Sequence, residues 1–156
     1  MPVTIRPSTP TDDPTLATII ATAMAEFGIP PAATDPHSIH REYSAANAIY
    51  YVAERDAEIL GGAGIVPIDC AIPATCELRK MYLSPAARGH GVGTALLEHC
   101  LQFARDQGYG HCYLETLPRM AAARKLYERF GFAARSDALT GESRCSAYYL
   151  LDLSGK

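Results

Sequence analysis

The stretch that decides the fold runs Cys76-Glu77-Leu78-Arg79-Lys80-Met81-Tyr82-Leu83-Ser84-Pro85-Ala86-Ala87-Arg88-Gly89-His90-Gly91-Val92-Gly93. Its first part alternates in polarity, which is typical of a strand, and Ser84-Pro85 marks a turn. Glycines at every second position then allow tight turning and a close backbone approach to a ligand. A helix that begins after them adds unpaired N–H groups and the positive end of its dipole. The stretch therefore predicts a strand, an anion-binding loop and a helix, with a phosphate or pyrophosphate as the ligand.

The composition is that of one ordinary globular domain. The chain has 156 residues, of which 48% are hydrophobic and 20% charged, and it shows no repeat or linker. We therefore expect a single domain over residues 1–156. The formal charge of −3 and the pI near 5.9 argue against binding to nucleic acid or to a membrane surface. The N-terminus lacks a signal-peptide pattern and no segment could span a bilayer, which favours a cytoplasmic location.

The cysteines and histidines do not form a metal-binding pattern. The cysteines contain no CxxC pair, and several fall at apolar positions of the expected strands and helices; they are Cys70, Cys76, Cys100, Cys112 and Cys145. Reduced core thiols in a cytosolic protein are the better interpretation than disulfides or a zinc site. His90, His99 and His111 have no ligand spacing. No metal is expected.

Hydrophobic periodicity predicts the remaining elements. The expected strands cover residues 3–6, 48–54, 58–67, 76–83, 111–117, 132–135 and 146–153. The expected helices cover residues 12–27, 35–43, 93–107 and 118–130, the last opened by Pro118. This order predicts a mixed, three-layer α/β fold. Within the strand at 76–83, strict alternation places Glu77, Met81 and Leu83 on one face.

Two common phosphate-binding motifs are absent, since the glycine loop is neither GxxxxGK[ST] nor GxGxxG. Arg88-x-x-Gly91-x-Gly93 instead resembles the [RQ]-x-x-G-x-[GA] acetyl-CoA signature of the GNAT superfamily of N-acetyltransferases. Residues 77–83 resemble the central fourth strand of that family, and Leu126-Tyr127-Glu128-Arg129-Phe130-Gly131-Phe132 resembles its [LY]-Y-E-[KR]-x-G-F helix end. The resemblance covers most of the chain. It implies the acyl-CoA N-acyltransferase fold, whose central sheet is mixed but mostly antiparallel, with splayed fourth and fifth strands.

By this resemblance, acetyl-CoA would bind where the fourth and fifth strands separate. Backbone N–H groups of residues 88–94 would hold the pyrophosphate, and the backbone of residues 81–83 would pair with the pantetheine. The implied cofactor-binding residues are Met81, Tyr82, Leu83, Arg88, Gly89, His90, Gly91, Val92, Gly93, Thr94, Met120 and Ala123. Many relatives carry Asn where this chain has Met120, so the contact made by that asparagine is lost here.

Transfer of an acetyl group to an amine needs a neutral amine, a stabilised oxyanion and a proton for the departing thiolate. A primary amine has a pKa of roughly 10, so it needs a base or a desolvating pocket. The resemblance implies Glu77 as the base, with pairing to Arg79 at the surface as the alternative and Glu115 as the next candidate base. It implies Tyr127 as the acid that protonates the thiolate, a purely structural role in the core being the alternative. A backbone N–H near Met81 would bind the oxyanion.

The acceptor site in this fold is built from the first two helices, their connecting loop and the loop before the last strand. Phe27, Tyr43 and Glu115 are the acceptor-binding candidates. We expect a small-molecule or amino-acid-like amine as the acceptor, with a protein amine as the alternative. Three questions stay open at this point: whether the chain forms a homodimer, whether it is an acyl-CoA sensor without turnover, and whether it binds a nucleotide instead.

Overall fold

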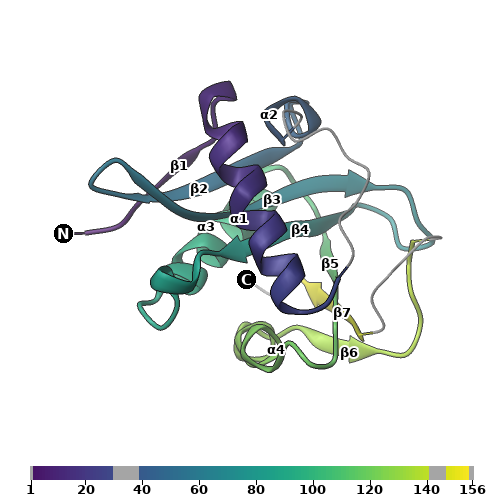
Figure 1. Ribbon diagram of the computed structural model, residues 1–156. Coiled ribbons are helices and arrows are strands. Elements are labelled where there is room, and N and C mark those ends of the chain that lie inside the picture. Colours follow the sequence, from purple (N-terminus) through teal and green to yellow (C-terminus); the bar gives the residue numbers. More distant parts are fainter. Residues whose placement is uncertain (1, 30–38, 141–146, 155–156) are drawn as a thin grey trace.

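The computed structural model describes residues 2–29, 39–140 and 147–154. These form one seven-stranded sheet in the order β1-β2-β3-β4-β5-β7-β6, with helices on both faces (Figure 1). The strands are β1 (Thr4–Pro7), β2 (Ile49–Arg55), β3 (Glu58–Ile68), β4 (Thr75–Leu83), β5 (His111–Thr116), β6 (Ala133–Arg135) and β7 (Ala147–Asp152). The helices are α1 (Asp13–Glu26), α2 (Ile39–Glu42), α3 (Val92–Asp106) and α4 (Ala121–Arg129), with short 3₁₀ helices η1 (Pro10–Asp12) and η2 (Pro85–Ala87). Only β4 and β5 pair in parallel among the described strands, so the predicted mixed fold is confirmed.

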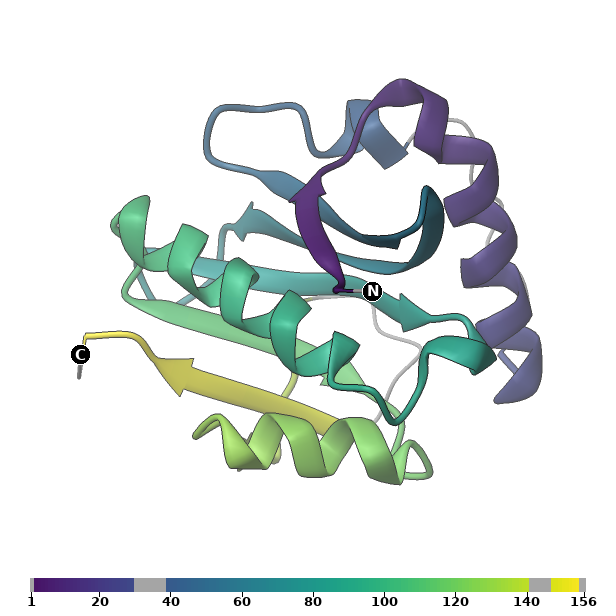
Figure 2. The ribbon, with the colours of Figure 1, turned by 90° about the vertical axis from the view of Figure 1, so that its left-hand side faces the viewer.

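The two faces of the sheet carry separate cores, which makes the three layers. On one face Leu16 of α1, Ile39 of α2 and Tyr43, which directly follows α2, are buried against β2 and β3. On the other face α3 and α4 contribute to a larger cluster that includes Leu97 and Tyr127. Figure 2 shows α1 and α3 on opposite sides of the sheet. Burial of these apolar side chains, at about 25 cal/mol per Å², is the main stabilising contribution in such a fold.

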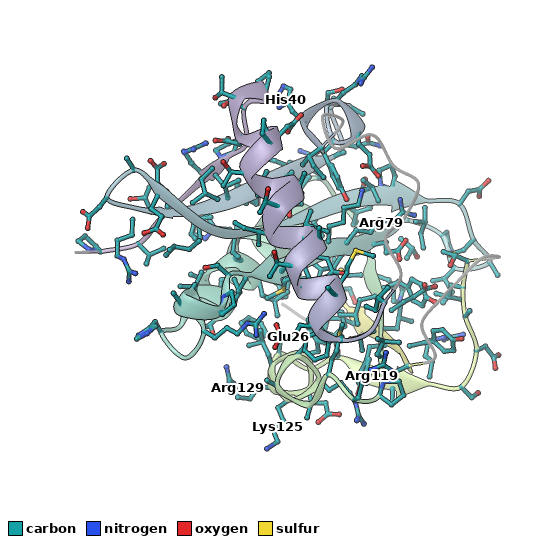
Figure 3. The ribbon with its side chains drawn as sticks, in the orientation of Figure 1. Glu26, His40, Arg79, Arg119, Lys125 and Arg129 are labelled. Atoms are coloured by element: carbon teal, nitrogen blue, oxygen red, sulfur yellow. The ribbon has the colours of Figure 1, made fainter. Side chains whose placement is uncertain are left out.

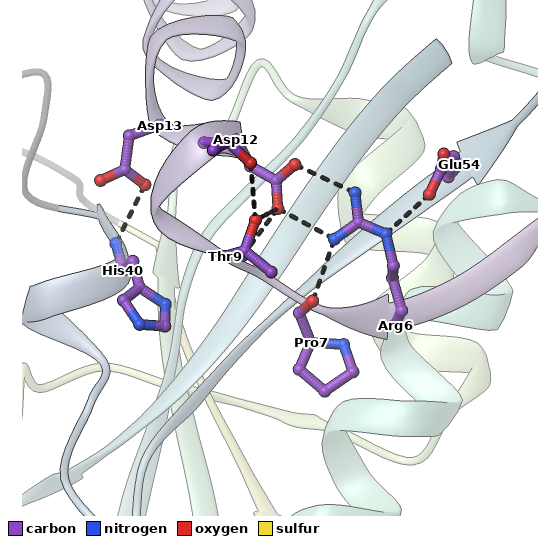
Figure 4. A network of polar contacts seen from close by, with 8 residues as sticks. Arg6, Pro7, Thr9, Asp12, Asp13, His40 and Glu54 are labelled. Carbon is purple, nitrogen blue, oxygen red and sulfur yellow. Dashed lines mark hydrogen bonds and ion pairs between the residues drawn. The ribbon is translucent and has the colours of Figure 1, made fainter. Parts of the chain in front are cut away.

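A network of charged groups fixes the start of α1 against the sheet (Figure 4). Arg6 of β1 donates two hydrogen bonds to the Asp12 carboxylate, at 2.9 and 3.0 Å, and a third to Glu54 of β2 at 2.6 Å. The hydrogen bond from Arg6 holds the pKa of Asp12 below its usual value. Asp13 then accepts a hydrogen bond from the backbone N–H of His40 at 3.1 Å. The network thereby holds α1 and α2 together on one face of the sheet.

The glycines inside β3 make room for aromatic rings. A Cβ on Gly62 would lie 2.4 Å from Cε2 of Tyr50, and one on Gly64 would lie 2.5 Å from Cε2 of Tyr43. The two tyrosine rings lie 5.1 Å apart. The hydroxyl of Tyr50 reaches across β3 and donates to the carbonyl oxygen of Lys80 at 2.7 Å. Glycine at these two positions of β3 therefore lets the tyrosine rings lie directly on the strand.

A bulge interrupts β4 at its centre. Gly62 of β3 pairs with Tyr82, but Gly64 pairs with Arg79, so β4 has one more residue than β3 over the same length. The φ angle of Lys80 is +53°, in the left-handed region that non-glycine residues rarely adopt. One extra residue reverses the alternation of side chains along a strand.

The bulge overturns the expected facing of the β4 side chains. Leu78, before the bulge, belongs to the core under α3, and Met81 and Leu83, after the bulge, pack against that same core. Glu77 is the neighbour of Leu78 and so points to the opposite face, toward α1 and α2. The prediction that Glu77, Met81 and Leu83 share a face is wrong, because it assumed an uninterrupted strand.

Most other boundaries lie within a few residues of the prediction, but α4 begins later than expected. Pro118 does not open the helix: the Met120 N–H bonds to the carbonyl oxygen of Leu117 at 3.0 Å, and this turn delays the first helical residue to Ala121. The predicted helix at 35–43 and the predicted start of the last strand at 146 fall partly on residues 30–38 and 141–146, which lie outside the described residues.

Three free cysteines lie in the core under α3, as expected of reduced thiols: Cys76, Cys100 and Cys112. Cys70 is half-buried, and Cys145 lies outside the described residues. Within the described ranges, no helix is long and apolar enough to cross a membrane. The same ranges contain no cluster of three or more His, Cys, Asp or Glu side chains that could hold a metal ion.

Candidate active site

β4 and β5 separate after only three residue pairs. Residues 75–77 of β4 pair with residues 111–113 of β5, and from there β4 pairs only with β3 and β5 only with β7. No described strand pairs with the remaining edge of β4, residues 78–83, which we call the open edge. An extended ligand can add to such an edge through backbone hydrogen bonds. The splay between the fourth and fifth strands is therefore present in the structure.

The glycine loop follows η2 and leads into α3. Gly89 and Gly91 have φ angles of +81° and +77°, and no atom lies within 4 Å of a Cβ placed on either residue. Gly91 caps α3, whose first turn has N–H groups without intrahelical acceptors. Gly93 is buried instead, and a Cβ there would lie 3.3 Å from Cε of Met81. The loop thus has free space for a ligand at its tip, while Gly93 keeps α3 close to β4.

The other residues expected to bind the cofactor surround this loop and the open edge. Those that are partly or fully buried are Tyr82, Leu83, Val92, Thr94, Met120 and Ala123, whereas His90 is exposed. The hydroxyl of Thr94 accepts a hydrogen bond from Arg129 of α4 at 3.2 Å. The sulfur of Met120 accepts one from Thr116 at 3.3 Å. Met120 therefore packs on the end of β5 and offers no amide in place of the family's asparagine.

Two arginines, one from each side of the strand divergence, hold the end of α1. Arg88 donates to the Glu26 carboxylate at 2.7 Å and to the carbonyl oxygen of Leu83 at 3.2 Å. Arg119, in the turn before α4, donates from Nε to the carbonyl oxygen of Phe27 at 3.0 Å and bonds it again through Nη2. Figure 3 shows Glu26 and Arg119 near the same end of α1. The side chain of Arg88 is therefore engaged with α1, and Phe27 is held through its backbone.

Tyr127 of α4 is buried and points its hydroxyl at β4. Its ring packs against Phe132 at 5.9 Å and against Tyr149 at 6.3 Å between centroids. Its hydroxyl lies 3.9 Å from the sulfur of Met81, at the open edge. The packing fixes the direction of the ring, so Tyr127 is a core residue whose hydroxyl lies beside β4, where the proton donor is expected.

Glu77 occupies the last pair before the strands separate, opposite Tyr113 of β5. Its side chain is only 8% exposed, and one oxygen accepts a hydrogen bond from Nε of Arg79 at 2.8 Å. Burial raises the pKa of Glu77, the charge of Glu115 raises it further, and Arg79 opposes both. A carboxylate whose pKa is raised toward neutrality is a better base at physiological pH.

Glu115, the other candidate base, accepts hydrogen bonds from two hydroxyl groups. One of its oxygens accepts hydrogen bonds from Tyr113 at 2.7 Å and from Thr140 at 2.6 Å. The Tyr113 hydroxyl in turn accepts one from the backbone N–H of Leu139 at 3.0 Å. Glu115 thereby attaches the loop after β6 to β5. Because its carboxylate is already hydrogen-bonded in this way, Glu77 is the stronger candidate for the base.

Tyr43, expected at the acceptor site, lies directly after α2 on the same face as Glu77. It is 4% exposed, and its hydroxyl is buried with no hydrogen-bond partner. Burial raises the pKa of Tyr43, and the charges of Glu42 and Glu77 raise it further, whereas the charge of Arg79 lowers it. Lys80 lies 6.0 Å above the ring and pairs with Glu42 at 2.7 Å. Nothing in the sequence indicated Lys80 beside Tyr43, because only the bulge brings its side chain to this face.

One hollow of the surface lies away from these groups. It has a volume of about 740 Å³ and lies between α1 and the β2–β3 hairpin, where Thr18, Ile59 and Ser84 contribute to its lining. None of the expected catalytic or cofactor-binding residues lines it. The candidate site is therefore defined by the strand divergence and the glycine loop.

Similar proteins identify the family of this chain. Residues 17–132 match the Acetyltransferase (GNAT) family. YjgM of Escherichia coli K12, described as an uncharacterized N-acetyltransferase, is 35% identical over 150 residues, which cover 91% of this chain and 90% of YjgM. Human N-acetyltransferase 8B is 35% identical over 102 residues, or 64% of this chain and 45% of the human protein. The chain thus spans about half the length of that human relative.

Solved structures share the fold at low sequence identity. A GNAT-family acetyltransferase from Staphylococcus aureus Mu50 superposes with a TM-score of 0.86 at 19% identity, over 98% of this chain and 100% of the other. The yncA structure from Salmonella typhimurium, a putative acetyltransferase with its cofactor acetyl-CoA, gives 0.78 at 19% identity over 100% and 96%. The family match defines an acyl-CoA-dependent transferase. The chain belongs to the GNAT family and is an acetyl-CoA-dependent N-acetyltransferase.

Proposed function

We propose that this enzyme moves the acetyl group of acetyl-CoA to the primary amine of a small, amino-acid-like acceptor, by direct attack in a ternary complex. One observation carries the proposal. Glu77 is a buried residue of β4 at the point where β4 parts from β5, and its side chain points to the face of α1 and α2, whereas buried Tyr127 reaches β4 from the other face. An amine and a leaving thiolate also need proton transfers at two different places.

Acetyl-CoA fits the residues present. The open edge offers backbone groups at residues 81–83 to the pantetheine, and the space around Gly89 and Gly91 lets a pyrophosphate approach the N–H groups of residues 88–94. When bound, it supplies a thioester carbonyl carbon for attack and a thiolate as the leaving group. The Arg88 side chain is tied to Glu26, so the backbone would carry most of the phosphate contacts.

The roles of the side chains follow from their positions. Glu77 takes a proton from the acceptor amine, directly or through a water molecule, as the new N–C bond forms. The C–S bond breaks, and Tyr127 gives its hydroxyl proton to the sulfur before regaining one from solvent. A backbone N–H near Met81 stabilises the negative charge on the carbonyl oxygen. Glu115 holds the loop after β6 in place beside the acceptor.

The test is release of free thiol from acetyl-CoA in the presence of a panel of amines, with wild type and Tyr127→Phe in parallel. We expect at least one small amine to support turnover, and the variant to lose about 10²- to 10⁴-fold in kcat while still binding acetyl-CoA. Lysine-containing peptides in the panel test the protein-amine alternative. Tight binding of acetyl-CoA without turnover of any amine would contradict the proposal and favour an acyl-CoA sensor.

A further inference from the structure

We propose that Arg79 binds a carboxylate group of the acceptor, so that the acceptors of this enzyme are amines that also carry a carboxylate, such as α-amino acids. The inference rests on the proposed function and names the substrate class of the same site. It is carried by the unused donors of Arg79, by the charges beside it and by the buried hydroxyl of Tyr43.

The guanidinium of Arg79 has N–H donors that are not used within the described residues. Its Nε bonds Glu77 at 2.8 Å, and within the described residues its two Nη groups make no hydrogen bond. The side chain is 40% exposed and lies beside α1 on the face that α1 covers (Figure 3). A guanidinium with free parallel donors is the group best suited to a carboxylate, which it binds through two N–H···O bonds.

Other cations around the strand divergence already have partners. Lys80 pairs with Glu42, Arg88 pairs with Glu26, and Arg119 bonds the carbonyl oxygen of Phe27. Their donors serve the attachment of α1 and α2 to the sheet. Arg79 instead pairs with Glu77, the residue that we expect to receive the amine proton.

The Glu77–Arg79 pair matches an amino-acid zwitterion charge for charge. The ammonium group would bind at the Glu77 carboxylate, release one proton to solvent to become the neutral amine, and give a second to Glu77 as the N–C bond forms. The carboxylate would lie at the Nη donors of Arg79. Such an acceptor would be oriented at two points, which fixes the amine nitrogen relative to the thioester. A simple alkylamine would satisfy only Glu77 and would leave the guanidinium without its second partner.

Tyr43 supplies an independent observation. Its hydroxyl is buried without a partner, and its ring lies against Gly64, the residue of β3 that pairs with Arg79. Buried polar groups are nearly always hydrogen-bonded, so an orphan hydroxyl beside a candidate site points to a missing acceptor. A carboxylate oxygen held by Arg79 would provide that acceptor.

The experiment compares α-amino acids with their α-carboxamides, which have the same side chain but no carboxylate. We expect wild type to prefer the acids, and Arg79→Gln to lower the acid-to-amide ratio of kcat/KM by about 10- to 100-fold, mainly through KM of the acid. Because each ratio is taken on one enzyme, any effect of the substitution on Glu77 cancels. Lys80→Gln is the matched control, since that neighbouring cation is already paired, and its ratio should stay at the wild-type value.

Two results would overturn the inference: a wild type that acetylates amides as well as acids, or an unchanged ratio in Arg79→Gln. Should that variant fail to fold, Arg79→Lys keeps the positive charge beside Glu77 but not the two parallel N–H donors of the guanidinium. The acid-to-amide ratio of kcat/KM should then fall by a smaller factor. If amides react and only Tyr127→Phe abolishes turnover, the proposed function stands without this inference. If no amine reacts, calorimetric binding of an α-amino acid to the coenzyme A complexes of wild type and Arg79→Gln still decides whether Arg79 holds the carboxylate.

Discussion

Replacing Glu77 by Gln tests the assignment of the base. The amide has the same shape, so it fills the same buried site while losing the ability to accept a proton. General-base catalysis contributes about 10²- to 10⁴-fold, which corresponds to roughly 3–5 kcal/mol of transition-state stabilisation. We therefore expect kcat to fall by that factor, with little change in the KM for acetyl-CoA, since Glu77 lies on the face away from Met81 and Leu83.

The pH dependence gives the sharper form of this prediction. Burial raises the pKa of Glu77 above the ordinary value of about 4.3, with Glu115 adding to the shift and Arg79 opposing it. Only the ionised carboxylate can act as a base, so activity should rise with pH through this raised pKa. The same shift means that ionising Glu77 costs folding stability as pH rises past 4.3, so Glu77→Gln should unfold at an unchanged or higher urea concentration at pH 7.

The assay is thiol release across pH with acceptors of different amine pKa. The limb of the wild-type profile that moves with the amine belongs to the substrate, and the limb that stays fixed belongs to Glu77. The fixed limb should disappear in Glu77→Gln and remain in the control Glu115→Gln. A variant that keeps the wild-type rate and the fixed limb would refute the assignment, and loss of the limb in Glu115→Gln would transfer the role to Glu115.

Further predictions concern the structure around the site. Gly62→Ala adds a Cβ 2.4 Å from a tyrosine ring of β2, so urea titration should show a loss of about 1–3 kcal/mol in unfolding free energy; an unchanged midpoint would refute this packing. Arg88→Gln should raise the KM for acetyl-CoA by less than about tenfold, and Glu26→Gln should leave it unchanged or lower it, whereas a much larger rise for Arg88→Gln would assign the phosphate contacts to the side chain. Because the pKa of Asp12 is lowered in the folded state, its ionised carboxylate contributes stability above about pH 4, and this contribution is lost as pH falls through the folded pKa. Asp12→Asn should therefore lower the unfolding free energy at pH 7 and lower it progressively less below pH 4. An equal loss at all pH values would contradict this.

Much of the fold could be predicted from patterns among residues that are close together in the sequence. The glycine spacing at Gly89 and Gly91 requires positive φ angles and a helix start, and both are present. The periodicity of α3 comes from one apolar face on the helix, so its position could be predicted without knowing its partners. The direction of Tyr127 followed from the family motif, because its own periodicity indicates only a core position.

What could not be predicted depends on pairing between distant segments. The bulge at Lys80 is a property of the register between β3 and β4, and the alternating sequence of β4 gives no sign of the extra residue. It changed the face of Met81 relative to Glu77. The partner of Arg88 was missed for a similar reason, since Glu26 is 62 residues away along the chain. The late start of α4 reflects one hydrogen-bonded turn after Leu117. Capping residues in a sequence do not locate the start of a helix to within so few residues.

The most direct test of the account is a crystal structure of this protein with coenzyme A. The central claim is that the cofactor lies along residues 81–83 of β4, with its pyrophosphate on the amides of residues 88–94 and its sulfur beside Tyr127. We expect roughly 3–4 Å between the sulfur and the Tyr127 hydroxyl oxygen, within hydrogen-bond reach. A sulfur lying well beyond that reach, or a pyrophosphate held away from Gly89 and Gly91, would contradict it.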